Sequence, residues 1–189
     1  MGSLKESASQ TAGPYVHIGL APGDAGFDIY TVELGRDIAG PEAKGARIAV
    51  TGVVYDAEGA PLKDVLVEIW QANADGIYPG AGPVEDGFVG FGRVIPDFET
   101  GTFSFTTIKP GAVDGMAPHL NLWLVSRGIN IGLSTRMYFG DEERANATDS
   151  VLGLIPADRR ATLFAEPTDD GYRFDIRLQG DDETVFFDI

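Results

Sequence analysis

The chain contains no cysteine among its 189 residues. This absence excludes disulfide bonds, thiolate catalysis, zinc fingers and iron–sulfur clusters, all of which need cysteine sulfur. Histidine is scarce as well, because the whole chain has only His17 and His119. The sequence also lacks a His-x-His pair, the HExxH and GxSxG motifs and a P-loop lysine motif, so the common signatures of zinc peptidases, serine hydrolases and nucleotide-binding proteins are missing.

Basic residues and long apolar runs are also few. The 14 Lys and Arg residues against 29 Asp and Glu residues give a formal net charge of -15. This balance argues against DNA or RNA as a partner, because phosphate recognition depends on clustered Lys and Arg. Residues 1–13 lack the apolar run of a signal peptide, and no later stretch approaches the roughly 20 apolar residues of a membrane helix. We therefore expect a soluble, cytoplasmic protein that binds neither nucleic acid nor membrane.

The dominant pattern is a hydrophobic period of two, which indicates half-buried β-strands. The first such segment is 47–55, and Gly59 and Pro61 predict a turn after it. We expect this segment to form a hairpin with the next one, 62–70, which ends at Trp70. Helix is expected only in short pieces, one capped by Asp141 and one opened by Pro156. Many short strands with turns between them predict a mainly β fold, a sandwich or a barrel. The expected strands after the hairpin are 102–107, 116–125, 129–139, 172–178 and 183–189.

The first 46 residues differ from the rest, since much of the segment is rich in Gly, Pro and Ala without a sustained period. We expect an extended arm at residues 1–46 that packs on another surface, followed by a β domain at residues 47–189. A second segment, residues 75–92, carries Gly and Pro at short intervals and is expected to be a long loop. Long loops in compact domains are usually functional or disordered.

One expected strand carries His119 and Asn121 on the face opposite to its leucines. A His-x-His pair on a strand offers two imidazoles to a metal, but here the second place holds an amide. A ferrous site of His17, His119 and a carboxylate is conceivable, yet nothing in the spacing brings the two histidines together. From the residues alone, the favoured interpretation of His119 is a hydrogen-bonded histidine of the core or of an interface.

Several segments occur in an order that is found in a known family. The most specific pieces are SQTAGPYVHIGL at 9–20, EIWQANADGIY at 68–78 and RFDIRLQG at 173–180. Together with the segments between them, they resemble the intradiol ring-cleaving dioxygenases over nearly the whole chain. The resemblance implies a β-sandwich of the intradiol dioxygenase type, with short helices and an extended N-terminal arm. It is nearest to members that consist of homologous α and β chains and that cleave protocatechuate with O₂ to 3-carboxy-cis,cis-muconate in aromatic catabolism.

In the enzymes that this chain resembles, two tyrosines and two histidines of the β chain hold ferric iron, which prefers phenolate and imidazole ligands. Here the first histidine is His119, and Asn121 takes the place of the second. Val113 replaces one tyrosine, no tyrosine occurs inside the loop between positions 78 and 92 where the other is expected, and Met116 replaces an arginine that assists substrate activation. The resemblance therefore implies no metal ligand set and no catalytic residue on this chain alone, with non-heme Fe³⁺ bound by a partner β chain.

The resemblance also implies substrate-binding residues, because the pocket of such enzymes lies at the junction of α and β. A guanidinium suits a substrate carboxylate, since it can pair with it through two parallel hydrogen bonds. From residue types alone, the arm segment is equally a Gly-Pro turn, and the arginine a surface ion pair. The residues are Thr11, Ala12, Gly13, Pro14 and Tyr15 of the arm and Arg127 after the strand of His119.

Three functions fit these observations. The first is an α subunit that shapes the substrate pocket of an αβ heteromer, with further symmetric assembly expected. The second is a β-sandwich binding or scaffold protein that has lost dioxygenase activity, because a fold does not guarantee a function. The third is a self-sufficient dioxygenase with displaced ligands.

Overall fold

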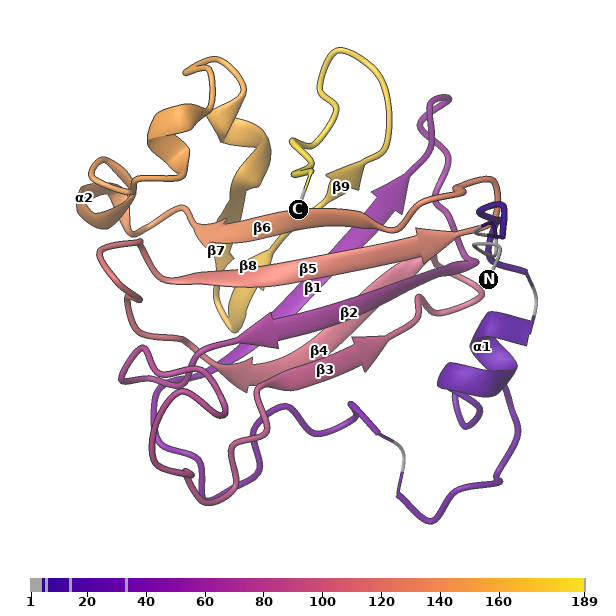
Figure 1. The fold of residues 1–189 in the computed structure, drawn as a ribbon, viewed down its shortest axis with the longest axis horizontal. Coiled ribbons are helices and arrows are strands. Elements are labelled where there is room, and N and C mark those ends of the chain that lie inside the picture. The colour runs from indigo at the N-terminus through magenta and orange to yellow at the C-terminus, as the bar shows by residue number, and fades with distance from the viewer. Residues whose placement is uncertain (1–4, 6, 14, 33, 189) are drawn as a thin grey trace.

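The computed structural model describes residue 5 and residues 7–13, 15–32 and 34–188 (Figure 1). In this part of the chain, nine strands form one sheet in the order β3-β2-β5-β6-β7-β8-β1-β4, with β9 paired to β1. The prediction of a mainly β fold is thus confirmed. The strands are β1 Arg47–Tyr55, β2 Val65–Gln71, β3 Phe91–Val94, β4 Thr102–Ile108, β5 His119–Ser126, β6 Leu133–Phe139, β7 Phe164–Thr168, β8 Gly171–Arg173 and β9 Ile176–Arg177.

The sheet folds over so that β3-β2-β5-β6 lies in front of β8-β1-β4, and β7 joins the two layers (Figure 1). The main core fills the space between the layers, with Val67 and Leu122 from one side and Val50 and Phe103 from the other. These residues occupy the apolar positions of the period-two pattern. Burial of each such side chain stabilises the fold by about 1.5–3 kcal/mol.

The predicted hairpin of β1 and β2 is wrong. β1 pairs antiparallel with β4, whereas β2 pairs with β3 and β5. The expected turn does form, since the Asp56 N–H donates to Ala60 O at 3.0 Å and the Leu62 N–H to Val54 O at 2.8 Å. Pairing stops there because the first part of β2 is buried on both faces, with residues 65–67 all inaccessible to solvent. A strand of this kind belongs inside a layer rather than at the edge beside β1.

Two expectations for the C-terminal segment need correction. Residues 172–178 keep their alternation but are divided into β8 and β9, because a side chain, Asp175 Oδ1, accepts the Val53 N–H at 3.0 Å in place of a ladder bond. Residues 183–188 form no strand, and a single bridge links Phe187 to Ser134. Ile189 lies outside the described residues.

The helical segments also differ from expectation. Asp141 does not cap α2, because its carboxylate accepts the Tyr172 hydroxyl at 2.9 Å and the N-cap position belongs to Glu142 without a side-chain bond. No helix begins at Pro156, and the sequence analysis missed both β7 and α1. None of the described helices has the length and apolar character that crossing a membrane requires. The helical segments are α1 Tyr15–Leu20, α2 Glu143–Asn146, and the 3₁₀ turns η1 Leu152–Leu154 and η2 Arg160–Leu163.

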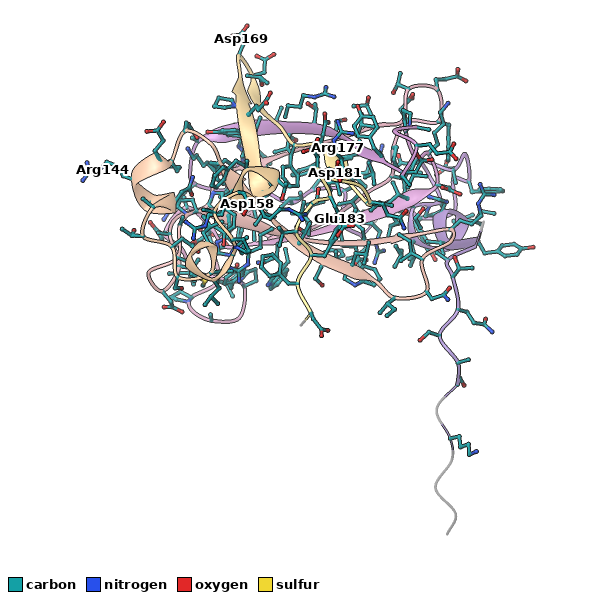
Figure 2. All side chains as sticks on the ribbon, turned by 90° about the horizontal axis from the view of Figure 1, so that it is seen from above. Arg144, Asp158, Asp169, Arg177, Asp181 and Glu183 are labelled. Atoms are coloured by element: carbon teal, nitrogen blue, oxygen red, sulfur yellow. The ribbon has the colours of Figure 1, made fainter. Side chains whose placement is uncertain are left out.

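The N-terminal segment has two parts. The described residues before α1 run away from the body of the protein toward the N-terminus, as a view from above shows (Figure 2), although Thr11 is still hydrogen-bonded to Gly128. The chain after α1 packs against the β domain instead, and Ile38 is part of the main core. The expected loop at 75–92 extends as far as Gly90, and β3 begins at the next residue, Phe91.

Candidate functional site

The His119 side chain lies at the start of β5 and is buried. Along the outer face of the front layer, His119 pairs in register with Tyr138 of β6, and Asn121 pairs with Arg136 of β6 and Trp70 of β2. The sequence analysis therefore placed His119 and Asn121 correctly on one strand.

Tyr78 reaches this face from the loop after β2, and the sequence analysis missed it. Its hydroxyl lies 3.2 Å from His119 Nε2, and it accepts a hydrogen bond of 2.7 Å from Asn121 Nδ2. The local turn that places it depends on Asn73, whose Oδ1 accepts the Ile77 N–H at 2.9 Å, and on Gly76, which has φ of 77°. Tyr78 is the last residue of the EIWQANADGIY segment at 68–78, so a signal for it was present in the sequence.

The hydrogen bonds of this cluster fix the tautomer of His119. Nδ1 lies 2.7 Å from the Ala117 carbonyl, which can only accept, so Nδ1 carries the proton. Nε2 is then the acceptor and binds the Tyr78 hydroxyl. Burial lowers the pKa of His119, and burial likewise raises the pKa of Tyr78 despite the opposing hydrogen bond from Asn121. Both groups are therefore neutral near pH 7.

This donor set does not fit a ferric ion. It offers one imidazole and one phenol, and the imidazole lone pair that a metal would need already accepts the Tyr78 proton. Val113 is buried and apolar, and the Met116 sulfur contacts Arg136 Nη1 at 3.3 Å. In the described ranges, no group of three or more His, Cys, Asp and Glu side chains is placed to hold a metal.

Four of the predicted substrate-binding residues lie at the other end of β5, namely Thr11, Ala12, Gly13 and Arg127. Thr11 Oγ1 accepts the Gly128 N–H at 2.6 Å and lies 3.4 Å from Ser126 O, so the arm is bound on both sides of Arg127. Ala12, Gly13 and Arg127 line one cavity of about 620 Å³ together with residues of α1 and of the β1–β2 connection. The structure thus brings together two segments that are more than 100 positions apart in the sequence.

Among the predicted residues that the structure describes, Thr11 and Tyr15 do not line that cavity. Tyr15 opens α1 and is 82% exposed. Pro14 lies outside the described residues. Arg127 Nε forms an ion pair of 3.0 Å with Asp64 Oδ2, and its side chain is 77% exposed. The surface ion pair considered from the sequence is thus present, and one edge of the guanidinium is engaged by it.

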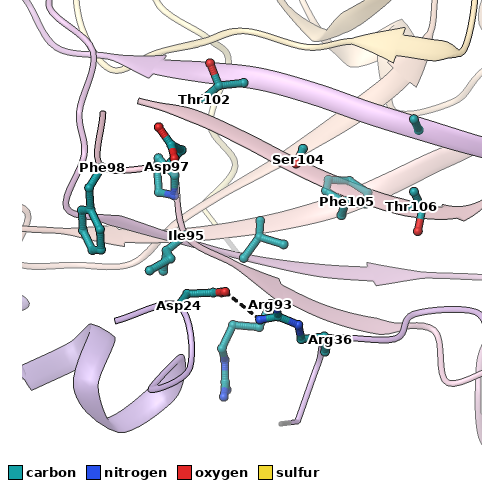
Figure 3. A pocket seen from close by; sticks show the side chains of 13 residues that line it. Asp24, Arg36, Arg93, Ile95, Asp97, Phe98, Thr102, Ser104, Phe105 and Thr106 are labelled. Atoms are coloured by element: carbon teal, nitrogen blue, oxygen red, sulfur yellow. Dashed lines mark hydrogen bonds and ion pairs between the residues drawn. The ribbon is translucent and has the colours of Figure 1, made fainter. Parts of the chain in front are cut away.

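A larger cavity, of about 640 Å³, lies between β3, β4 and the loop after α1 (Figure 3). Its two guanidinium groups already have carboxylate partners, because Arg36 pairs with Asp24 at 2.6 Å and Arg93 pairs with Glu68 at 2.6 Å. None of the predicted substrate-binding residues that the structure describes lines it. The ion pairs of Arg36 and Arg93 therefore stabilise the segment after α1 and β3, respectively.

Comparison with known proteins agrees with this geometry. A family model described as "Dioxygenase" matches residues 31–117. The chain is 49% identical to the protocatechuate 3,4-dioxygenase alpha chain of Pseudomonas putida, over 98% of each chain. It is 37% identical to a protocatechuate 3,4-dioxygenase beta chain of Burkholderia cepacia, over 76% of this chain and 68% of that one.

A solved structure supports the fold. The dioxygenase domain of a dioxygenase carbohydrate-binding protein fusion from Streptomyces sp. SirexAA-E superposes with a TM-score of 0.60 at 24% identity and covers 96% of this chain and 100% of that one. The whole-chain identity to an alpha chain exceeds the partial match to a beta chain. The chain therefore belongs to the intradiol dioxygenases and, within that family, to the protocatechuate 3,4-dioxygenase alpha chains.

Proposed function

We propose that this chain is the subunit without iron in a heteromeric protocatechuate 3,4-dioxygenase. A homologous β chain holds the non-heme Fe³⁺, and the assembled enzyme cleaves protocatechuate with O₂ to 3-carboxy-cis,cis-muconate. The observation that carries the proposal is the hydrogen-bonded cluster of Tyr78, His119 and Asn121. In this cluster His119 Nε2, the nitrogen that a metal would need, accepts a hydrogen bond from the neutral phenol of Tyr78. A chain with this cluster contributes to the reaction through its shape and charge.

The position of the arm supports a shared pocket. The arm and Arg127 lie at the end of β5, and His119 lies at its start, eight residues earlier. At about 3.3 Å per residue, this separation is about 26 Å. The arm and Arg127 therefore cannot complete a site around the chain's own His119. We propose that residues 1–46 form the arm that lines the partner interface, and that residues 47–189 form the dioxygenase-like domain.

Two of the proposed substrate-binding residues, Gly13 and Arg127, have separate tasks. Gly13 has no side chain, and an added Cβ would meet nothing within 4 Å, so the arm leaves space beside its backbone. The Arg127 guanidinium can pair with a substrate carboxylate through the edge that Asp64 does not use. Orientation of the substrate and exclusion of water are contributions that need no redox group on this chain.

The experiment that tests the proposal is expression of this chain alone, of the β chain alone, and of both together. We expect protocatechuate-dependent O₂ uptake to be full only in the co-purified complex. If the two chains do not co-purify and this chain forms a stable assembly by itself, the protein is instead a binding or scaffold protein that has kept the fold. If the β chain alone has the kcat/KM of the complex, this chain does not shape the pocket.

A further inference from the structure

A cavity of about 620 Å³ lies on the outer face of β2, β5 and β6, beside the Tyr78 cluster. This volume is within the range of about 300–1,000 Å³ that small-molecule sites occupy. Aromatic and aliphatic side chains make most of its wall. The lining side chains that carry the argument are Trp70, Phe91, Trp123, Leu154 and Phe187, with Arg136 as the cation.

The strand register arranges these side chains in two rows. Trp70, Asn121 and Arg136 lie opposite one another across β2, β5 and β6. In the next row, Glu68 and Ser134 flank Trp123. Since neighbouring strands are about 4.8 Å apart, Trp70 and Arg136 lie about 10 Å apart across the face. The Trp70 indole and the Arg136 guanidinium thus lie on either side of the Asn121 amide.

The two tryptophans are the exposed part of this wall. Trp70 is 40% exposed and Trp123 is 39% exposed, although both are large apolar side chains. Trp70 is held in place by stacking on Tyr78, with ring centroids 6.0 Å apart and planes 16° apart. The orientation of Trp70 is therefore fixed, and both indoles keep exposed apolar surface that a planar aromatic ligand can contact.

Arg136 presents an open hydrogen-bonding edge. Its Nη1 donates to the Tyr138 hydroxyl at 3.2 Å and contacts the Met116 sulfur at 3.3 Å. With the described residues, Nε and Nη2 form no hydrogen bond and Arg136 forms no ion pair, even though the chain has 29 acidic residues. Nε and Nη2 make the parallel pair of donors that binds a carboxylate in bidentate fashion.

The other charge that faces the cavity is already neutralised. The Glu68 carboxylate accepts from Arg93 Nε at 2.9 Å and Nη2 at 2.6 Å. Arg136 is therefore the charged group of this cavity that remains available to attract a ligand, and it favours an anion.

We propose that this cavity binds a monocyclic aromatic carboxylate. Arg136 pairs with the carboxylate through Nε and Nη2, Trp70 and Trp123 contact the ring, and Asn121 lies beneath it. The proposal goes beyond the proposed function and does not depend on it, because binding here needs neither iron nor a partner chain. No bond is made or broken in the ligand.

The test uses intrinsic fluorescence of the full chain. The chain has two tryptophans, and both line this cavity, so emission excited at 295 nm reports on the site alone. We expect saturable quenching by benzoate and by 4-hydroxybenzoate. Benzamide, which has nearly the same shape without the charge, is expected to bind at least about tenfold more weakly, because a charge-assisted pair is lost. Equal affinity for benzoate and benzamide, or the absence of saturable quenching by benzoate, would overturn the proposal.

Matched variants locate the site. Arg136→Met is expected to weaken benzoate binding at least about tenfold, and Arg136→Lys to weaken it less, because a lysine keeps the charge but not the bidentate edge. Arg144→Met, which removes an exposed arginine of α2 that does not line this cavity, is expected to leave the quenching unchanged. The proposal is contradicted if Arg136→Met binds benzoate as the unchanged chain does, or if the Arg144 variant loses binding instead.

The same site is accessible to measurement in the assembled protein. Equilibrium dialysis of the αβ complex with labelled benzoate is expected to give one bound ligand fewer per αβ pair when the complex carries Arg136→Met. An unchanged number would mean that a segment of the partner covers the cavity, which would overturn the proposal for the complex. A failure of the chains to associate would count against the proposed function and would leave the fluorescence result intact.

Discussion

The Tyr78→Phe substitution tests the hydrogen-bonded cluster directly, because it removes one oxygen and keeps the ring that stacks on Trp70. Two hydrogen bonds are lost, to His119 Nε2 and from Asn121 Nδ2. Asn121 Nδ2 retains the Trp70 carbonyl at 3.3 Å, whereas the buried Nε2 of His119 is left without a partner. A lost net hydrogen bond is worth about 0.5–1.5 kcal/mol and an unsatisfied buried acceptor costs about 1–3 kcal/mol. We expect the free energy of unfolding to fall by about 2 kcal/mol.

Urea unfolding followed by circular dichroism measures this change. With a typical slope for a domain of this size, the midpoint is expected to move down by about 1 M urea without a change in slope. Tyr15→Phe is the matched control, because Tyr15 is 82% exposed and its hydroxyl makes no hydrogen bond with the described residues. The control is expected to change stability by less than about 0.5 kcal/mol. Equal stability of the two variants would refute the hydrogen-bonded cluster.

Two further predictions concern His119 and Arg127. Because the folded pKa of His119 lies below its ordinary value, the unfolded chain takes up the proton first, and stability present above about pH 6.5 is lost as the pH falls toward the folded pKa. We expect urea unfolding to show a lower free energy of unfolding at pH 5.5 than at pH 7, and a smaller loss in His119→Gln; equal slopes would contradict the prediction. Arg127→Leu in the αβ complex is expected to raise KM for protocatechuate and lower kcat/KM about tenfold or more. Asp64→Asn, which breaks the same ion pair but keeps the guanidinium, is expected to leave both unchanged, and an unaltered Arg127→Leu enzyme would show that Arg127 is a surface ion pair.

The strands were predictable where one face is buried, since alternation then determines which residues point inward. β1 was placed with its observed bounds, and β5 and β6 were placed within a few residues. Pairing was less predictable, because β1 and β2 are separated by a good turn and yet belong to different layers. The turn residues specify only the local bend. The choice of partner depends on burial of both faces of β2, which is a property of the whole core.

Side-chain hydrogen bonds account for most of the remaining errors. Asp141 has the position of a helix cap but bonds to Tyr172, which is distant in sequence. Asp175 interrupts a strand by accepting a backbone N–H. Tyr78 reaches His119 across 41 positions. Such contacts depend on the folded arrangement, whereas the juxtaposition of the arm with Arg127 had a signal in the sequence because both segments resembled the family.

The most direct measurement is the iron content of this chain purified alone, after incubation with a ferric salt and removal of the excess. Since the Nε2 of His119 is engaged by Tyr78 and Asn121 stands where a second imidazole is needed, we predict less than about 0.1 iron per chain and a colourless protein. The co-purified αβ complex is predicted to contain about one iron per αβ pair and to show the red-brown absorption of tyrosinate bound to ferric iron. Stoichiometric iron in the isolated chain would contradict the account.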